Sequence, residues 1–187
     1  MKPKYNYKQL IILKSKYNIK TFKDNLKSKE RFNITNDYVK PKGGLWLSSY
    51  DPTYEWLSDW GYWCSCEAPE WIGTDGILID IKRTARIAQI KDMNDLQHFF
   101  KRYPFIRYTE DGWGNKEISH FSGRCLNYEL MRKDFDIIHL TGQGQYKTRM
   151  PDTSFYNLNL YGWDCESSLM LNNVINNFQK IPIGQGA

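Results

Sequence analysis

The segment 161-YGWDCESSLML-171 places two carboxylates directly before a run that is typical of a buried strand. Residues 168–171 form that run, and Asp164 and Glu166 precede it. A junction between loop and strand can present a side chain to a cleft while the strand holds the backbone in place. The segment therefore indicates either a catalytic glutamate, Glu166, or a surface glutamate that ends a strand.

The segment 43-GGLWLSSYDPTYEW-56 has the composition of a turn, a strand and an aromatic loop. Residues 41–44 combine proline with glycine, which favours a turn, and the expected strand covers residues 45–49. Glycine at the start of a strand lets the backbone approach a ligand, because no Cβ intervenes. The rings and hydroxyls that follow would line a pocket for a planar group, although a tryptophan-rich core strand after a glycine turn has the same pattern.

The remaining chain alternates between short segments that are typical of strands and of helices. Residues 141–161 show little periodicity and are expected to form a long loop, and loops of that length are usually functional or mobile. One α+β domain over residues 1–187 is the simplest interpretation. The other expected elements are strands at 7–13 (strand or short helix), 76–81, 85–90 and 136–140, helices at 18–26, 54–64, 92–103 and 126–133, and a polar stretch at 109–117.

The composition is ordinary for a soluble globular protein, with 41% apolar and 25% charged residues. No apolar run is long enough to span a membrane, and the first residues do not form the core of a signal peptide. We therefore predict a cytoplasmic protein without a membrane partner. In that setting the four cysteines are expected to be free thiols rather than disulfides or zinc ligands, and no metal site is predicted.

The positive charge of the chain is concentrated near its N-terminus. Residues 1–42 carry twelve Lys or Arg against three acids, whereas the remainder carries 14 against 18. A basic segment beside an acidic body indicates a polyanionic partner such as nucleic acid, or else a solvated lysine-rich face.

Taken together, the two quoted segments resemble the ADP-ribosyltransferase superfamily, which includes poly-ADP-ribose polymerases and many bacterial and phage mono-ADP-ribosyltransferases. In that family a Gly-aliphatic-aromatic-x-small-Ser strand leads to a short helix with another aromatic ring, and the catalytic glutamate heads a strand after a long recognition loop. Here 44-GLWLSS-49 is similar to the first motif, and Glu166 after residues 141–161 is similar to the second. The resemblance implies an α+β domain with a split, mixed and antiparallel sheet and flanking helices. In this interpretation residues 1–42 are a basic N-terminal segment and residues 43–180 are the catalytic core.

The resemblance also implies a substrate, NAD, and a role for each site residue. Glu166 would bind the ribose 2′-hydroxyl and stabilise the oxocarbenium-like charge that forms as nicotinamide leaves, with Asp164 orienting or deprotonating the nucleophile. Family members carry Arg or His in the first strand for the NAD phosphate or ribose, whereas the candidate strand here, residues 10–16, offers only Lys14 and Lys16. The implied NAD-binding residues are Gly44, Trp46, Lys14, the ring of Tyr54 or Trp56, and Ser48 and Ser49, which support the glutamate or the ribose.

The leading hypothesis is therefore an NAD-dependent mono-ADP-ribosyltransferase of bacterial or phage toxin type. Such a glycosyltransferase cleaves the nicotinamide–ribose bond and transfers ADP-ribose to a macromolecular acceptor, either protein or nucleic acid. Two alternatives stay open, a nucleic-acid-binding protein without enzymatic activity and an inhibitor-type protein-binding module on a related fold. The basic residues 1–42 favour the first alternative, and the lack of a first-strand Arg or His favours the second. His139, within an apolar run, is interpreted as a core histidine rather than a general base.

Overall fold

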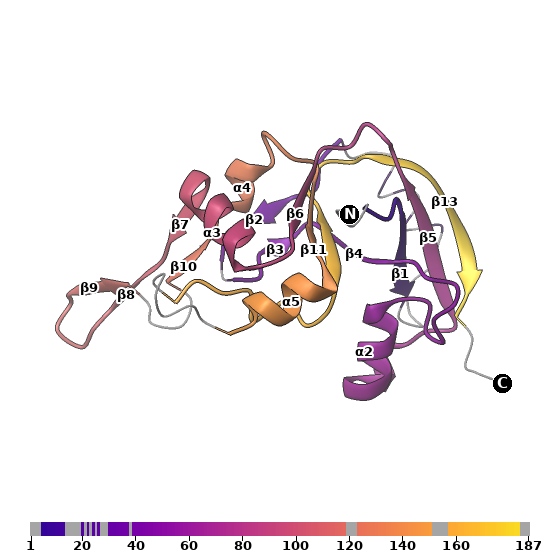
Figure 1. Cartoon of the computed structure of the whole chain (residues 1–187), viewed down its shortest axis with the longest axis horizontal. Coiled ribbons are helices and arrows are strands. Elements are labelled where there is room, and N and C mark those ends of the chain that lie inside the picture. Colours follow the sequence, from indigo (N-terminus) through magenta and orange to yellow (C-terminus); the bar gives the residue numbers. More distant parts are fainter. Residues whose placement is uncertain are drawn as a thin grey trace.

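Seven strands form one mixed sheet at the centre of the molecule (Figure 1). The computed structural model describes residues 5–13, 20, 22, 24, 26, 30–37, 39–118, 123–150 and 157–183. The strands of the sheet are β1 (Lys8–Leu13), β4 (Leu45–Ser49), β5 (Asp75–Ile81), β6 (Ile87–Ile90), β11 (Ile137–Leu140), β12 (Ser167–Met170) and β13 (Ile175–Pro182). Their order is β13-β5-β1-β4-β12-β11-β6, and every neighbouring pair is antiparallel except β11 and β6.

The sheet is weakly joined between β1 and β4. These strands pair only through Gln9 with Ser49 and Leu10 with Ser48, whereas β1 pairs with β5 along its whole length. The sheet is thus divided into β13-β5-β1 and β4-β12-β11-β6, and a cavity lies between the two parts. The α+β class and the mixed sheet that the sequence predicts are confirmed.

The two faces of the sheet bury separate hydrophobic clusters, because neighbouring residues of a strand point to opposite faces. Along β11, Ile137 belongs to one cluster, whereas Ile138 and Leu140 belong to the other. The helix α3 (Met93–Arg102) packs against the second cluster, and Asp92 caps its first turn. The sequence predicts this helix at residues 92–103.

The helix α2 (Asp59–Glu67) begins later than the sequence predicts. Residues 54–64 have the apolar spacing of a helix, but the chain makes turns up to Ser58, whose hydroxyl caps α2 by accepting from the amide of Gly61 at 3.1 Å. Asp51, which precedes these residues, serves a local turn, because its carboxylate accepts hydrogen bonds from the amide and the hydroxyl of Thr53.

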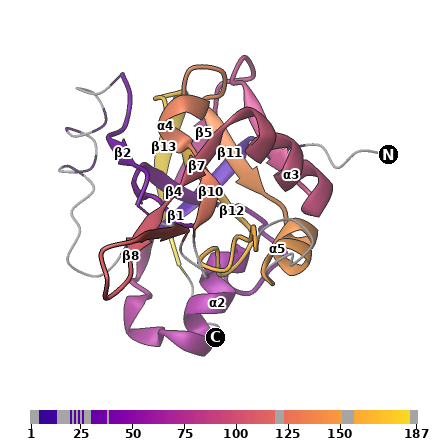
Figure 2. The ribbon, with the colours of Figure 1, turned by 90° about the vertical axis from the view of Figure 1, so that its left-hand side faces the viewer.

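The helix α5 (Gly142–Thr148) lies where the sequence predicts a loop over residues 141–161, so that prediction is wrong over these residues. The segment GQGQYKT has no apolar periodicity that would reveal a helix. Its start is fixed by Thr141, whose hydroxyl accepts from the amide of Gly144 at 3.0 Å. Figures 1 and 2 show α2 and α5 below the sheet, and their first residues approach each other there.

Smaller elements surround the sheet. A hairpin formed by β8 and β9 projects from the body (Figure 1) and occupies the polar stretch 109–117, where the sequence predicts no strands. The helix expected at 126–133 is shorter because Leu126 belongs to a strand. These elements are β2 (Ile34–Thr35), β3 (Lys42–Gly43), η1 (Pro69–Trp71, a 3-10 helix), β7 (Pro104–Ile106), β8 (Tyr108–Glu110), β9 (Lys116–Ile118), β10 (Arg124–Leu126) and α4 (Tyr128–Met131).

Some predictions fall on residues that the structure does not describe. Lys14, Lys16 and part of the expected loop, residues 151–156, lie outside the described residues. Within the expected helix at 18–26, the described residues are helical.

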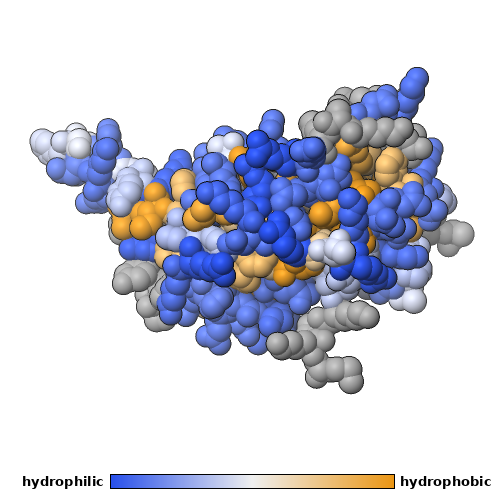
Figure 3. Space-filling model, turned by 90° about the horizontal axis from the view of Figure 1, so that it is seen from above, coloured by the Kyte–Doolittle hydropathy of each residue, from blue (hydrophilic) through white to orange (hydrophobic). Residues whose placement is uncertain are grey.

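The surface seen in Figure 3 is largely hydrophilic and carries apolar residues in patches. No helix in the described part of the chain is long and apolar enough to cross a membrane.

Candidate functional site

Glu166 stands directly before β12, where this strand runs beside β4. Ser168 pairs with Leu47, so the register places Glu166 across from Ser49 at the end of β4. Glu166 is only 8% exposed. Burying a carboxylate is unfavourable unless hydrogen-bond donors surround it, so the donors around Glu166 define the site.

Three hydrogen bonds from two serines hold the Glu166 carboxylate. Ser49 donates with its amide to Oε2 at 2.9 Å and with its hydroxyl to Oε1 at 2.8 Å. The hydroxyl of Ser48 donates to Oε2 at 3.0 Å. Consecutive strand residues point to opposite faces of a sheet, so these serines hold the carboxylate from two sides. The structure thus brings together three residues that the sequence analysis groups in one site.

Two further donors set the direction of the serine protons. The amide of Trp60 donates to Oγ of Ser48 at 3.3 Å, and Nε2 of Gln9 donates to Oγ of Ser49 at 3.2 Å. Because each hydroxyl oxygen already accepts a hydrogen bond, its own proton is free to point at Glu166. Gln9 is fully buried on β1 and belongs to the site, although the sequence analysis did not single it out.

His139 of β11 is a third neighbour of the Glu166 carboxylate. Its Nδ1 lies 3.2 Å from Oε1 of Glu166 and 2.9 Å from Oγ of Ser168. Burial lowers the pKa of His139 to about 4, so the ring is neutral at pH 7 and its contact with Glu166 is not an ion pair. The hydrogen bond of Nδ1 is the one shared with the Ser168 hydroxyl, which holds the ring beside the carboxylate. The sequence analysis interprets His139 as a core histidine, and the buried ring also contacts the candidate site.

Two opposing effects set the acidity of Glu166. Burial raises the pKa of its carboxyl, whereas the hydrogen bonds from Ser49 and Ser48 lower it, and the net direction is upward. A carboxyl whose pKa is shifted by burial and by specific partners, and which borders a cleft, is a typical functional group.

Glu166 borders a cleft of about 300 Å³, which we call the polar cleft. Ser49 and Gln89 line it, and so does the ring of Tyr54, which is 42% exposed. A carboxylate, an amide and an aromatic ring that converge on one hollow are typical of sites for small polar ligands. The other lining residues are Asn6, Asp51, Ser58, Asp59, His139, Thr141 and Gly142.

A second hollow, which we call the acidic groove, has a volume of about 430 Å³. It shares Glu166, Asp59 and Gly142 with the polar cleft, and Glu67 and Asp164 add two more carboxylates. Among the described residues that line it, none is Lys or Arg, so the groove favours neutral or cationic ligands. The other lining residues are Tyr62, Trp63, Cys66, Gln145 and Cys165.

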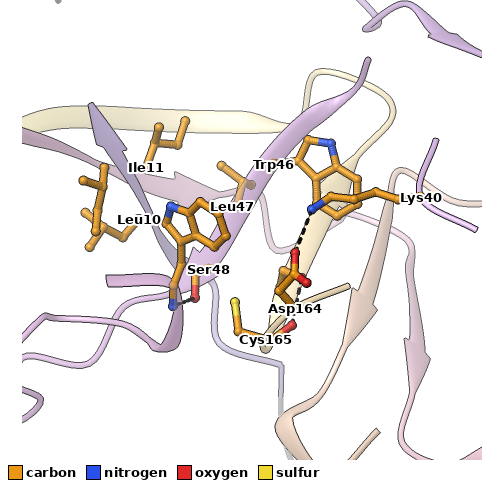
Figure 4. A pocket seen from close by; sticks show the side chains of 11 residues that line it. Leu10, Ile11, Lys40, Trp46, Leu47, Ser48, Asp164 and Cys165 are labelled. Carbon is orange, nitrogen blue, oxygen red and sulfur yellow. Dashed lines mark hydrogen bonds and ion pairs between the residues drawn. The ribbon is translucent and has the colours of Figure 1, made fainter. Parts of the chain in front are cut away.

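The cavity between β1 and β4, which we call the split cavity, has a volume of about 320 Å³ and lies beside these hollows. Figure 4 shows Leu10 and Leu47 on its apolar wall and Trp46 near Lys40. The ammonium of Lys40 lies 3.5 Å from Oδ2 of Asp164 and 4.8 Å from the centre of the Trp46 ring. Asp164 is therefore held by a cation at the rim of the split cavity.

Gly44 and Trp56, two of the predicted NAD-binding residues, have packing roles in this structure. Gly44 has φ +70°, and a Cβ there would lie 2.3 Å from Cδ1 of Leu169, so a close approach to a side chain accounts for the glycine. Trp56 packs with Leu10 and Ile12 in a hydrophobic cluster. Neither residue is among those that line the polar cleft or the acidic groove. The predicted phosphate contact, Lys14, lies outside the described residues.

Three residues of the site escaped the sequence analysis as functional residues, namely Gln9, Asp59 and His139. Gln9 lies within the apolar strand KQLIIL and His139 within IIHL. A polar residue within an apolar run indicates a buried polar side chain, so the sequence does carry a signal for these two residues. Asp59 has no comparable signal, because an acid in the first turn of a helix is common. In the described part of the chain, no group of three or more His, Cys, Asp or Glu is placed to hold a metal ion.

A comparison with protein-family models, with curated proteins and with solved structures finds no match to this chain. The function is therefore inferred from the chemistry of the site and from the resemblance of its two segments.

Proposed function

We propose that the protein is an NAD-dependent ADP-ribosyltransferase whose catalytic carboxylate is Glu166. The observation that carries the proposal is the buried Glu166 carboxylate, which Ser48 and Ser49 hold where it borders the polar cleft. A serine pair on one strand beside a glutamate that heads the next strand is also the arrangement that the sequence resemblance implies.

Glu166 acts on the charge that develops at the ribose. The bond between C1′ and the nicotinamide nitrogen breaks, its electron pair leaves with nicotinamide, and the ribose gains positive charge. A fixed anion stabilises this transition state more than the ground state, because the charge on the ribose is largest there. The hydrogen bonds from Ser48 and Ser49 keep the carboxylate in place, and loss of a preorganised group that stabilises the charge directly, as Glu166 does, lowers rates by about 10²–10³.

The polar cleft supplies contacts for the nicotinamide end of NAD. The ring of Tyr54 offers a surface on which nicotinamide stacks. The amide of Gln89 has no hydrogen bond to the described residues and is free to bind the carboxamide or a ribose hydroxyl. At about 300 Å³ the cleft is at the lower end of ligand-pocket volumes, so it holds the nicotinamide riboside end and leaves the diphosphate outside.

We propose a protein rather than a nucleic acid as the acceptor. The acidic groove meets the polar cleft at Glu166 and is the route by which an acceptor reaches the ribose. Its carboxylates from Asp59, Glu67 and Asp164 repel the phosphates of a nucleic acid. Tyr62 and Trp63 add rings that suit contact with protein side chains.

NAD cleavage by the purified protein, followed as nicotinamide release by chromatography, tests the proposal. The wild type should release nicotinamide alone or with a cell lysate, and Glu166→Gln, which keeps the shape but not the charge, should be slower by about 10² or more. Glu117→Gln on the exposed β8–β9 hairpin is the matched control and should behave as the wild type. A wild type that neither binds nor cleaves NAD, or a fully active Glu166→Gln, would overturn the proposal.

The acceptor class is tested with NAD that carries a label on its ADP-ribose. After incubation with a lysate, label that protease releases and nuclease does not supports a protein acceptor. The opposite pattern identifies a nucleic acid. The non-enzymatic alternative predicts no label transfer and nucleic-acid binding that weakens steeply with salt.

A further inference from the structure

Asp59 occupies the junction of the two hollows. It is the first residue of α2, and it lines both the polar cleft and the acidic groove, as Glu166 does. The first residue of α5, Gly142, also lines both hollows, and a Cβ built on it would lie 3.7 Å from Oδ2 of Asp59. The Asp59 carboxylate therefore stands where an acceptor in the groove would meet a ribose in the cleft.

The surroundings of Asp59 differ from those of the other two carboxylates. Serine donors surround Glu166, and the Lys40 ammonium holds Asp164 at 3.5 Å. Asp59 has no side-chain hydrogen bond and no ion pair to any residue that the structure describes. A half-buried carboxylate without partners is the one of the three that is free to accept a proton.

Electrostatics increase the basicity of this group. Burial raises the pKa of Asp59, and the neighbouring charges of Glu166 and Asp51 raise it further. Two carboxylates with different surroundings can divide their tasks, one staying ionised and held by hydrogen bonds and the other exchanging a proton. General bases with a pKa nearer neutrality transfer protons more effectively at pH 7.

We propose that Asp59 is the general base that deprotonates the acceptor, an inference that rests on the proposed ADP-ribosyl transfer. As the bond between C1′ and nicotinamide breaks, the acceptor atom forms the new bond to C1′ and its proton passes to Oδ of Asp59. Nicotinamide leaves as a neutral molecule with the electron pair, and Asp59 later returns the proton to water. Asp164, to which the sequence resemblance assigns this role, has its carboxylate paired with Lys40.

A purely structural role for Asp59 has to be separated from this one. An acid in the first turn stabilises a helix through the helix dipole, so a substitution affects stability as well as catalysis. Asp59→Asn keeps the shape and removes the base, and Ser58 still caps α2 in that variant. Thermal unfolding and circular dichroism of each variant report the structural contribution.

The experiment is NAD hydrolysis, in which water is the acceptor, with kcat and KM measured separately. For Asp59→Asn we expect kcat to fall by about 10²–10³ while the KM for NAD stays within about threefold, because the base acts on the acceptor and not on NAD. The kcat of Asp164→Asn should fall less than that of Asp59→Asn. Glu117→Gln is again the control.

Azide gives a readout that a structural role would not change. Azide is already an anion, so it attacks C1′ without a base. It should restore turnover to Asp59→Ala and yield ADP-ribosyl azide, detected by mass spectrometry, and it should not restore Glu166→Gln.

The outcomes separate this inference from the proposed function. A wild type that neither binds nor cleaves NAD, alone or with a lysate, or a fully active Glu166→Gln, overturns both. If Glu166→Gln is inactive while Asp59→Asn keeps its kcat, or if azide does not rescue a folded Asp59→Ala, the role of Asp59 is overturned and that of Glu166 stands.

Discussion

Ser49 contacts both oxygens of Glu166, donating from its amide to Oε2 at 2.9 Å and from its hydroxyl to Oε1 at 2.8 Å. The two bonds fix the plane of the carboxylate, because rotation of the carboxylate would break one of them. A side-chain substitution at Ser49 removes the hydroxyl bond and leaves the amide bond in place. The contribution of this one bond to catalysis is therefore measurable.

Ser49→Ala should slow NAD cleavage without preventing NAD binding. A hydrogen bond to a charged group contributes about 1.5–3 kcal/mol, so we expect kcat to fall about 10- to 100-fold with little change in KM. Steady-state kinetics of nicotinamide release measure both constants. Ser65→Ala is the matched control, because its hydroxyl donates to the carbonyl of Tyr62 within α2. A wild-type kcat for Ser49→Ala would contradict the prediction.

The neutral state of buried His139 should make the protein less stable in mild acid. Its folded-state pKa of about 4 lies below the ordinary value of 6.5, so the unfolded chain takes up a proton that the folded chain excludes. This contribution to stability is complete above about pH 6.5 and is lost as the pH falls toward 4, and it amounts to about 2–3 kcal/mol.

Urea unfolding at pH 7 and at pH 4.5 measures the loss. Between pH 7 and pH 4.5, the free energy of unfolding should fall less for His139→Gln than for the wild type. His98→Gln, at an exposed position of α3, is the control, and its free energy of unfolding should fall as much as that of the wild type. Parallel losses in the wild type and His139→Gln would show that another group is responsible.

Asp136 should stabilise the fold down to a much lower pH. Burial raises the pKa of its carboxyl, but hydrogen bonds from Arg86 and Asn172 lower it to about 2. Because the folded-state pKa is depressed, the stabilisation is present above about pH 4 and is lost as the pH falls through 2. The Arg86 side chain is half exposed, so solvent screening reduces the contribution to about 1–2 kcal/mol.

Denaturation of the wild type and Asp136→Asn between pH 7 and pH 2 checks this prediction. The difference between their free energies of unfolding should be largest at pH 7 and should shrink as the pH falls to 2, where the Asp136 carboxylate is becoming protonated. A difference that does not depend on pH would mean that Asp136 stabilises the fold by its shape alone.

Local sequence patterns predicted the elements whose structure depends on local interactions. The strand at 45–49 follows from its composition, and the helix at 92–103 follows from its apolar spacing and its aspartate cap. Patterns failed where distant residues decide the structure. The strand β13 lacks a clear alternation, yet it pairs with β5 along most of its length, and α5 is fixed by its contact with β6.

The same division applies to the candidate site. The sequence groups Ser48, Ser49 and Glu166 because they lie in two segments that resemble motifs of one family. The partners Gln9 and His139 reach the site only through the pairing of β1 with β4 and of β11 with β12. Strand register, which a single sequence does not reveal, therefore decides which buried polar residues join the site.

Gly144→Ala should destabilise the protein although alanine favours helices. In the interior of a helix alanine is better than glycine by about 1 kcal/mol, which alone would stabilise α5. A Cβ at Gly144 would lie 2.2 Å from the carbonyl oxygen of Ile90, and this backbone atom cannot move aside cheaply because β6 is hydrogen-bonded to β11. We expect a net loss of about 1–3 kcal/mol and a lower Tm. Gly112→Ala is the matched control, since a Cβ there meets nothing within 4 Å. Equal Tm values for the two variants would show that α5 is not packed against β6 as described. That packing matters to the site, because α5 carries Gly142 to the junction of the two hollows.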